Sequence, residues 1–515
     1  MSVDTSPGPS SSSVVSKGLK AGALGLTATV VIGVASTAPG YSLAASVGYV
    51  TDAVNLQAPA IMLVAFIPMA FIAAAYFYMN RADPDCGTTF TWATRALGPR
   101  TGWMGGWGII MADLVIMPNL AGVTAQYTYL LFGLDKLAAN KWAVLALGCT
   151  YLLLMSWVCV TGIELSARSQ VLLLGTEILT LVVFSVVAIV KVMGPNPPKG
   201  SVKPSLSWIN PFAISSWGGV VAGVLVALFI YWGWDTAVTV NEECEDANTT
   251  PGKAGVISTV ILLFVYVIVT TGAQAVKGPQ FLSDHPDDAL GAVGEIVLGG
   301  WLNKVLILAV MSSAMASTQT TILPAARSML SMGSHKAGPA VLAEVDRKHL
   351  TPAKSTWFFG IVSCLWYLLL VAIGGEDQNP YYASIAAVGL MIAFYYGLTG
   401  ITCVVYYRKY LFRNWKNFVF VGLMPGLGGL ILSVVFVKSL VDNFQNKEDY
   451  GSLLGAGSVF TIGVALLVLG VPLMLWCRRT YPDFFRIRRD PEDVIPNPDG
   501  TGEPAPVLGT FRKEA

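Results

Sequence analysis

The sequence predicts an all-α integral membrane protein with twelve transmembrane helices. Of its 515 residues, 54% are hydrophobic and only 12% are charged, and the mean hydropathy is +0.61. This composition leaves no room for a sizeable soluble domain. Long runs without Lys, Arg, Asp or Glu recur along the chain, and each supplies the ~20 apolar residues that a helix needs to cross the hydrocarbon core.

The predicted spans follow directly from the placement of charged residues. The fully uncharged runs are 24–50, 53–80, 142–162, 254–276, 305–326, 355–375, 380–407, 417–437 and 450–476. Three further runs, 101–134, 169–190 and 204–241, each contain a single acid. Together these runs give the twelve predicted helices.

The loops between the spans predict an orientation. With the N-terminus inside, most Lys and Arg residues fall in cytoplasmic loops, among them Arg81, Arg95, Arg100, Arg327 and Lys348. This bias is typical of membrane proteins and places both ends of the chain in the cytoplasm. The protein is therefore predicted to be a multi-pass protein of the cytoplasmic membrane, with the lipid bilayer as its surroundings.

Both ends of the chain have the composition of tails. Residues 1–20 begin with Pro, Gly and a serine run, which cannot bury apolar surface, and are predicted to be a disordered cytoplasmic tail. Residues 481–515 end in a stretch rich in Pro, Gly and Asp and are predicted to be a second cytoplasmic tail. We expect neither tail to carry a catalytic module.

Three carboxylic acids interrupt the apolar runs: Asp113, Glu177 and Asp235. A charged side chain at bilayer depth costs roughly 3 kcal/mol on insertion scales, so such a residue usually marks a pathway for ions, protons or substrate. Because the predicted spans contain no Lys or Arg, the three acids favour a cation, an amine or a proton over an anion. This pattern predicts a transporter, although a purely structural role for Asp113 is an equal alternative.

Other classes of function are poorly supported. The seven cysteines show no disulfide or metal-ligand spacing, and the three histidines all fall in loops, so a metal site and a membrane-embedded enzyme are not expected. The net charge of +1 gives no reason to expect a nucleic acid partner. No cofactor is predicted beyond a coupling ion, either a proton or sodium.

Two spans contain residues that interrupt a helix. Residues 33–40 combine two glycines with Pro39, which lacks a backbone donor, and residues 231–236 place Gly233 between two tryptophans. These breaks lie in the first and sixth predicted spans, the spacing expected for two inverted repeats with a site at their interface. The predicted repeats are 21–193 and 204–408, followed by the last two helices at 409–480.

Three motifs carry a family resemblance. Residues 229–243, FIYWGWDTAVTVNEE, resemble the sixth-helix motif of the amino acid, polyamine and organocation (APC) superfamily of secondary transporters. Residues 83–107, DPDCGTTFTWATRALGPRTGWMGGW, and residues 325–352, AARSMLSMGSHKAGPAVLAEVDRKHLTP, are similar to the loop after helix 2 and the segment after helix 8. The resemblance runs from about residue 20 to 480 and implies a leucine-transporter-like 5+5 fold with broken helices 1 and 6.

The resemblance also implies a substrate site at the two breaks. The first break would hold a carboxylate or polar head through Ser36, Thr37, Ala38 and Gly40, although Thr37-Ala38-Pro39 stands where many members have Gly-Ser-Gly. The second break would hold an amine and gate the cavity through Tyr231, Trp232, Gly233, Trp234 and Asp235. Glu242 and Glu243, which end the motif, would form cytoplasmic gate or loop salt bridges.

The coupling residue departs from the family pattern. Glu177 aligns where proton-coupled members commonly carry a lysine, so the resemblance implies that Glu177 carries the proton. Asp113 would assist it or contact a cationic side chain. Ser313 and Thr318 are a possible cation site, although hydroxyls that bond back to their own helix are equally ordinary.

Taken together, the sequence predicts a proton-coupled permease that imports an amino acid or a related amine by alternating access. The alternatives are a polyamine or cationic amino acid exchanger, a sodium-coupled symporter, and a sensor that binds amino acids without moving them. The oligomeric state and the choice between symport and exchange are left open.

Overall fold

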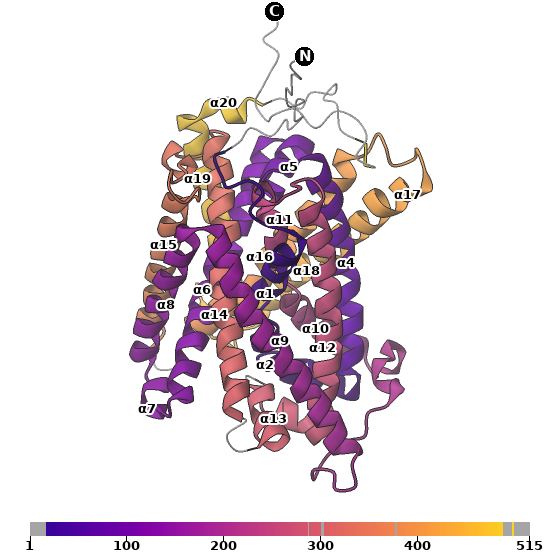
Figure 1. The fold of residues 1–515 in the computed structure, drawn as a ribbon. Coiled ribbons are helices and arrows are strands. Elements are labelled where there is room, and N and C mark those ends of the chain that lie inside the picture. The colour runs from indigo at the N-terminus through magenta and orange to yellow at the C-terminus, as the bar shows by residue number, and fades with distance from the viewer. Residues whose placement is uncertain (1–16, 287, 300–302, 376–378, 488–496, 499–515) are drawn as a thin grey trace, which may run out of the picture.

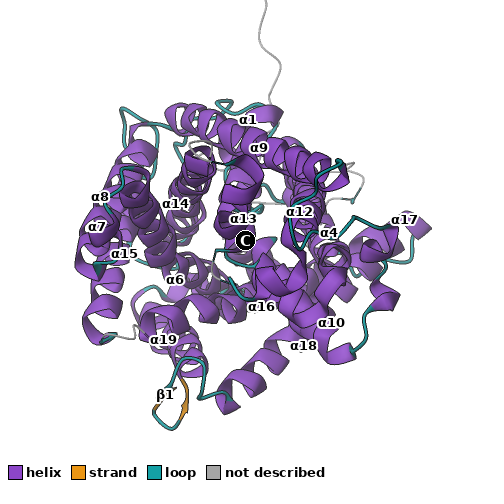
Figure 2. Ribbon diagram, turned by 90° about the horizontal axis from the view of Figure 1, so that it is seen from below, coloured by secondary structure: helices purple, strands orange, loops and turns teal. Residues whose placement is uncertain are grey.

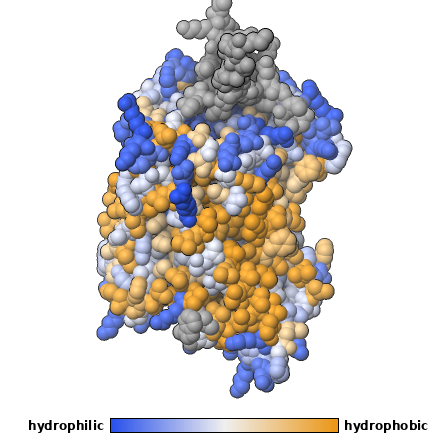
Figure 3. Space-filling view, in the orientation of Figure 1, coloured by the Kyte–Doolittle hydropathy of each residue, from blue (hydrophilic) through white to orange (hydrophobic). Residues whose placement is uncertain are grey.

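The computed structural model describes residues 17–286, 288–299, 303–375, 379–487 and 497–498, which form a bundle of long helices (Figure 1). We call the end of the bundle that carries α5 (Thr89–Leu97) and α20 (Pro482–Phe485) the terminal pole, and the end that carries α7 (Asp135–Ala138) and α13 (Ala289–Leu298) the opposite pole. Hydrophobic residues cover a broad band between two hydrophilic poles (Figure 3). This surface fits a bilayer.

Within the described residues, eleven helices are long and apolar enough to cross a membrane. They are α1 with α2 (Leu26–Ser36 and Pro39–Ala44), α3 with α4 (Val47–Val54 and Ala58–Ala82), α6 (Pro99–Leu131), α8 (Lys141–Thr161), α9 (Ile163–Met193), α12 (Thr250–Ser283), α14 (Asn303–Ser334), α15 (Ala353–Ile373), α16 (Asn379–Tyr406), α17 to α18 (Trp415–Asn417 to Met424–Gln445) and α19 (Ser458–Thr480). The predicted all-helical membrane fold is confirmed.

The run predicted at 204–241 is not among the eleven long helices of the described residues. It contains the 3₁₀ turns η2 (Leu206–Ile209) and η3 (Pro211–Ala213), then α10 (Trp217–Ile230), α11 (Thr236–Thr239) and the 3₁₀ turn η4 (Asn241–Glu243). Gly233, with φ of 112°, lies between α10 and α11. The helix is therefore interrupted at the predicted second break.

The first predicted span ends earlier than its hydrophobicity suggests. The Ala45 N–H donates to the Tyr41 carbonyl and the Ser46 N–H to the Leu43 carbonyl, which closes α2, and α3 begins at Val47. The 3₁₀ turn η1 (Asn55–Gln57) then connects α3 to α4. Charge-free sequence continues through Ala45 and Ser46, so the run at 24–50 does not reveal where α2 ends.

The remaining elements are short. They are the 3₁₀ turn η6 (Ala340–Ala343), the π-helical turn η7 (Phe418–Leu423) before α18, and a small hairpin of β1 (Ser452–Leu453) and β2 (Ala456–Gly457). The hairpin pairs Ser452 with Gly457 and Leu453 with Ala456 in antiparallel register. The described part of the C-terminal segment begins with α20, where Phe484 is buried against the bundle.

Helix α6 is the most enclosed of the long helices in the described residues. In α6, 94% of the most apolar window is buried, compared with 28% in α18 and in α19. Figure 2, along the bundle, shows α6 with α14, α16 and α19 around it, and α18 at the periphery. Asp113 therefore sits on the most enclosed helix, and α18 and α19 present the most surface to lipid.

Candidate functional site

The first break separates α1 from α2 at Thr37 and Ala38. Ala38 adopts the left-handed conformation, with φ of 46°, and Pro39 starts α2 without a backbone donor. The N–H groups of Thr37 and Ala38 bond back to Val34 and Ala35 at 3.2 and 3.1 Å. The backbone donor of Ala38, which was predicted for a substrate, is thus used within the helix end.

The second break packs directly on the first. A Cβ on Gly233 would lie 2.7 Å from the carbonyl oxygen of Ser36, so only glycine permits this approach. The hydroxyls of Ser36 and Thr236 are 2.8 Å apart, and Ser317 on α14 donates to the Ser36 carbonyl at 2.8 Å. The two predicted breaks therefore form one contiguous region inside the bundle.

Glu177 on α9 is joined to the first break. Its Oε1 accepts hydrogen bonds from the Gly40 N–H at 2.7 Å and from the Ser313 hydroxyl at 2.8 Å, and Ser313 accepts the Tyr41 N–H at 3.2 Å. Glu177 is fully buried, and its Oε2 has no hydrogen-bond partner among the described residues. The Gly40 donor predicted for a substrate is occupied here by a side chain of the protein.

Asp235 lies in a nest of tyrosine hydroxyls. Tyr396 donates to its Oδ1 at 2.8 Å, and Tyr395 and Tyr76 donate to its Oδ2 at 3.1 and 3.4 Å. Trp232, from the same break, donates its indole N–H to the Tyr395 hydroxyl at 2.5 Å. The second break is therefore tied to α4 and α16 through one buried carboxyl group.

Asp113 belongs with the second break. It is 4% exposed, and its Oδ2 has no hydrogen-bond partner within the described residues. It is near enough to Asp235 for the two carboxyl groups to interact electrostatically. The structure thus brings Asp113 and Asp235 together, whereas Glu177 serves the first break.

The two hydroxyls predicted as a possible cation site have different surroundings. Ser313 belongs to the Glu177 cluster, but Thr318 donates to the Ala314 carbonyl of its own helix at 2.8 Å. The ordinary alternative, a hydroxyl bonded back to its helix, therefore describes Thr318.

A vestibule of about 790 Å³ opens toward the opposite pole, where Ala138, Lys141 and Asp288 line it. Its deeper lining includes Tyr41, Asn119, Leu228, Val310 and Ile392. The residues predicted for the site lie beneath it and do not line it. Its lining includes Tyr41, the residue after Gly40, and Val310, which lies about one helical turn before Ser313 on α14.

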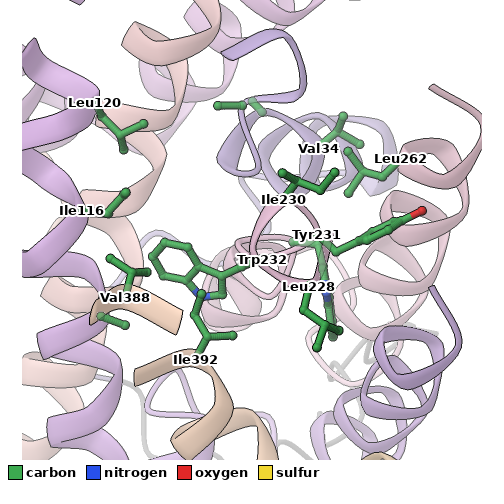
Figure 4. Packing of buried hydrophobic residues seen from close by; sticks show 14 of the residues in the cluster. Val34, Ile116, Leu120, Leu228, Ile230, Tyr231, Trp232, Leu262, Val388 and Ile392 are labelled. Atoms are coloured by element: carbon green, nitrogen blue, oxygen red, sulfur yellow. The ribbon is translucent and has the colours of Figure 1, made fainter. Parts of the chain in front are cut away.

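Trp232 lies between the vestibule and the Asp235 nest. Figure 4 shows its ring pointing toward Ile116, Val388 and Ile392, whereas Tyr231 points the other way, toward the helix that carries Leu262. Trp232 is 8% exposed, and Ile392 beside it lines the vestibule. The Trp232 ring is thus placed where it can separate the vestibule from the buried acids.

Ion pairs close the terminal pole. Arg327 at the end of α14 bonds Glu243 through two nitrogens at 2.7 and 2.8 Å, and both side chains are at most 2% exposed. Arg95 on α5 bonds Asp83 at 2.6 and 3.3 Å. Ion pairs therefore join the segments at the terminal pole, whereas the vestibule opens toward the opposite pole.

Sequence reasoning missed the tyrosines that hold Asp235. Tyr395 and Tyr396 are adjacent in a charge-free span, and Tyr76 lies in another, so each could have been an ordinary core aromatic. A pair of hydroxyl-bearing aromatics in a predicted span was the one available signal, since buried Tyr hydroxyls usually need a partner.

Comparison with known proteins finds similarity to transporters of amino acids and polyamines. A family model described as amino acid permease matches residues 22–479. The branched-chain amino acid permease BcaP of Lactococcus lactis is 22% identical over 78% of this chain and 84% of the relative. Large neutral amino acids transporter small subunit 2 of Homo sapiens is 24% identical (67% of this chain, 63% of the relative), and polyamine transporter RMV1 of Arabidopsis thaliana is 25% identical (64% and 65%).

Proposed function

The chain belongs to the amino acid permease family, and from this premise we propose that it imports an amino acid or a related amine across the cytoplasmic membrane by alternating access. The observation that carries the proposal is the contact between the two helix breaks, Gly233 on Ser36, beneath a vestibule open to one pole. Two broken helices that meet near the middle of a bundle are the usual place for a substrate in secondary transporters.

The proposed topology has twelve crossings. Eleven of the crossings are the long helices of the described residues. The sixth crossing consists of α10 and α11, which we count together although the break divides them. We propose that residues 21–193 and 204–408 are inverted repeats, that 409–480 add two helices, and that the terminal pole faces the cytoplasm. The basic loops of the sequence support this orientation.

In this orientation the described conformation is outward-facing. The vestibule gives access from outside, and the buried Arg327–Glu243 pair closes the inner side. Substrate would enter past Tyr41 and Asn119, whose side chains are hydrogen-bonded to each other, and would displace the Trp232 ring. Opening toward the cytoplasm would then require α14 to separate from the end of the second break.

The proposed substrate site lies where the breaks meet. The substrate's amine would face the acidic side, formed by Asp113 and Asp235, and its polar head would face Ser36 to Gly40. Asp113 supports this assignment because one of its buried oxygens lacks a partner within the described part of the chain. An ammonium group would satisfy that oxygen, which otherwise carries the cost of an unmade hydrogen bond.

We propose that Glu177 carries the coupling proton. As a neutral acid it fits a fully buried site whose donors, among the described residues, are one hydroxyl and one amide, and as an anion it would need a cation. A sodium ion near Ser313 and Thr318 is the alternative for coupling. The proton is favoured because Ser313 already serves Glu177 and Thr318 bonds to its own helix.

Uptake into proteoliposomes of the purified protein tests the proposal. Labelled leucine, arginine and putrescine are compared under an inward proton gradient, with and without Na⁺ and a protonophore. Accumulation of leucine or arginine that collapses with the protonophore supports a proton-coupled amino acid importer. Accumulation of putrescine alone would move the substrate to polyamines, and strict Na⁺ dependence would move coupling to the hydroxyls. Specific binding without uptake of any probe would favour a sensor and overturn transport.

A further inference from the structure

The segment 17–25, which precedes α1, is strapped across the terminal pole. The N–H groups of Ala23 and Leu24 both donate to the Glu243 carbonyl, at 2.8 and 3.0 Å, and the Glu245 N–H donates to the Leu24 carbonyl at 3.0 Å. Leu19 packs against Cys86 and Leu330. Residues 17–20, which the sequence assigned to a disordered tail, are thus docked, and residues 1–16 lie outside the described residues.

Lys17, at the start of this strap, is buried among acids. Its ammonium contacts Asp85 Oδ2 at 2.8 Å and also forms an ion pair with Glu242, and its side chain is 5% exposed. Asp85 follows α4, and Glu242 lies in η4 just after the second break. A single ammonium group thus bridges three segments that are distant in sequence.

Asp85 extends the bridge to a fourth segment, the end of α14. Its Oδ1 accepts from the Ser331 hydroxyl at 2.6 Å and the Gly87 N–H at 2.8 Å, and its Oδ2 lies 2.8 Å from His335 Nε2. Both Ser331 and His335 follow Arg327, which pairs with Glu243. The Lys17 cluster and the Arg327–Glu243 pair are therefore neighbouring parts of one closure.

Charge balance makes Lys17 the critical member of the cluster. One carboxylate oxygen of Asp85, one of Glu242 and the Cys86 sulfur lie within 4.8 Å of one another. The Lys17 ammonium contacts all three residues. Burial alone would raise the pKa of Asp85, but Lys17 and then His335 outweigh it and hold the pKa well below its ordinary value. Without Lys17, two carboxylates would face each other with little exposure to water, which is strongly unfavourable.

We propose that Lys17 is a positioning residue that latches the inner side closed, so that the strap sets the ratio of outward- to inward-facing protein. The inference rests on the proposed alternating access. An inward path along the second break requires η4 to move away from the α4–α5 loop and α14, and the Lys17 ammonium bonds the first two directly. The charged or titratable groups that face it are Asp85, Cys86, Glu242 and, through Asp85, His335.

The test uses the thiol of Cys86, which is buried in the closed form, in the full-length chain with the other cysteines replaced by alanine or serine. We expect Lys17→Met to raise the rate of maleimide labelling about tenfold, the effect of 1.4 kcal/mol lost from a closed form that contained a buried ion pair. Lys17→Arg should keep the rate low. The matched control is Lys20→Met, because Lys20 pairs with Glu164 on the surface, with both side chains more than 40% exposed.

A second reporter distinguishes opening of the whole protein from local exposure of Cys86. Ala386→Cys, in a Cys86→Ala background, places a thiol in the lining of the vestibule. If Lys17 is a latch, Lys17→Met lowers labelling from the outside at this position while it raises labelling of Cys86. Faster labelling of Cys86 with unchanged vestibule labelling would reduce Lys17 to local packing and overturn the latch, as would no change at Cys86.

Two controls distinguish the labelling result from an effect on folding and from an effect on transport. Each variant is first compared with the parent protein by its midpoint of thermal unfolding in detergent, and if Lys17→Met does not fold, Glu242→Gln repeats the test with the strap intact. Because labelling requires no substrate, a chain that transports none of the probes but shows the reciprocal change would keep the latch and lose the proposed function. Transport of a probe without the reciprocal change in labelling would keep the proposed function and overturn the latch.

Discussion

The Oε1 atom of Glu177 lies 2.7 Å from the amide nitrogen of Gly40, the residue that follows Pro39 in the first helix break. The sequence predicted that this half-helix end would hold the carboxylate or polar head of a substrate. Here a carboxyl group of the protein already engages that donor. The Glu177 carboxyl group is thereby joined to the first break by a direct hydrogen bond, and a second link runs through the Ser313 hydroxyl to the Tyr41 N–H.

Glu177→Gln is expected to uncouple accumulation from pH. The amide oxygen of glutamine can still accept from Gly40 and Ser313, but the side chain cannot release a proton. Proteoliposomes with this variant should exchange labelled for unlabelled substrate but should not concentrate it under an inward proton gradient. Glu164→Gln is the control, because Glu164 lies on the same helix, is exposed and pairs with Lys20. Full pH-driven accumulation by the Glu177→Gln variant would remove Glu177 from the coupling step.

Gly233→Ala should abolish transport and destabilise the fold. At φ of 112° any L side chain is strained, and the new Cβ would lie 2.7 Å from the Ser36 carbonyl oxygen. We expect a loss of at least ~1 kcal/mol of stability from the conformation alone, seen as a lower midpoint of thermal unfolding in detergent. Gly218→Ala on α10 is the control, because a Cβ there meets nothing within 4 Å. Equal midpoints in the two variants would contradict the close contact.

The spans and the breaks could be predicted because each rests on local physical chemistry. A membrane helix must satisfy its backbone internally, so long charge-free runs are strongly constrained, and Gly233 between two tryptophans marks a point where that constraint is relaxed. The turn at Ala45 and Ser46 escaped prediction because the residues on both sides are apolar. Hydropathy has no signal for a helix end inside a charge-free run.

The partners of the buried acids could not be predicted in the same way. Asp235 meets Tyr76 and Tyr396 from helices that are distant in sequence, and nothing in the periodicity of either span identifies the inward-facing hydroxyls. Lys17 follows a serine-rich stretch with the composition of a tail. Its burial depends on the acids of two remote loops, which only the folded chain brings together.

Asp113→Asn should discriminate between substrates by charge. Because Oδ2 of Asp113 has no partner within the described residues, the amide replacement removes no described hydrogen bond at that atom and should fold. Loss of the negative charge is expected to reduce kcat/KM for arginine or putrescine about tenfold more than for leucine, which corresponds to ~1.4 kcal/mol. Asp52→Asn, at an exposed position on α3, is the control. An equal reduction for all three probes would assign Asp113 a structural role.

The buried pair of Arg327 and Glu243 should show strong coupling in a double-mutant cycle. Removal of one partner from a buried pair costs about 3–5 kcal/mol because the other charge is left uncompensated. Arg327→Met is therefore expected to lower the unfolding midpoint more than the double variant Arg327→Met/Glu243→Gln. The surface pair Lys354 and Glu344, each about half exposed, should give a coupling of at most ~1 kcal/mol. Additive effects at Arg327 and Glu243 would show that they do not act as a unit.

The latch at Lys17 should not depend on pH in the range where transport does. The pKa of Asp85 is held below its ordinary value, so its contribution to the closed form is present above that value and is lost only as the pH falls through the lowered pKa. Burial alone would lower the pKa of Lys17, but Asp85 and the other neighbouring groups raise it overall, so its contribution is lost only as the pH rises above the ordinary lysine value.

Between ~pH 5 and ~pH 9 both groups therefore keep their charges. Maleimide labelling of Cys86, corrected for the reactivity of a free thiol at each pH, is expected to be constant from about pH 6 to about pH 8. In the same range proton-driven uptake should change in the parent protein and lose its pH dependence in Glu177→Gln. A corrected Cys86 rate that rose steeply with pH would show that closure depends on a group that titrates in this range, and coupling would then involve the inner side as well as Glu177.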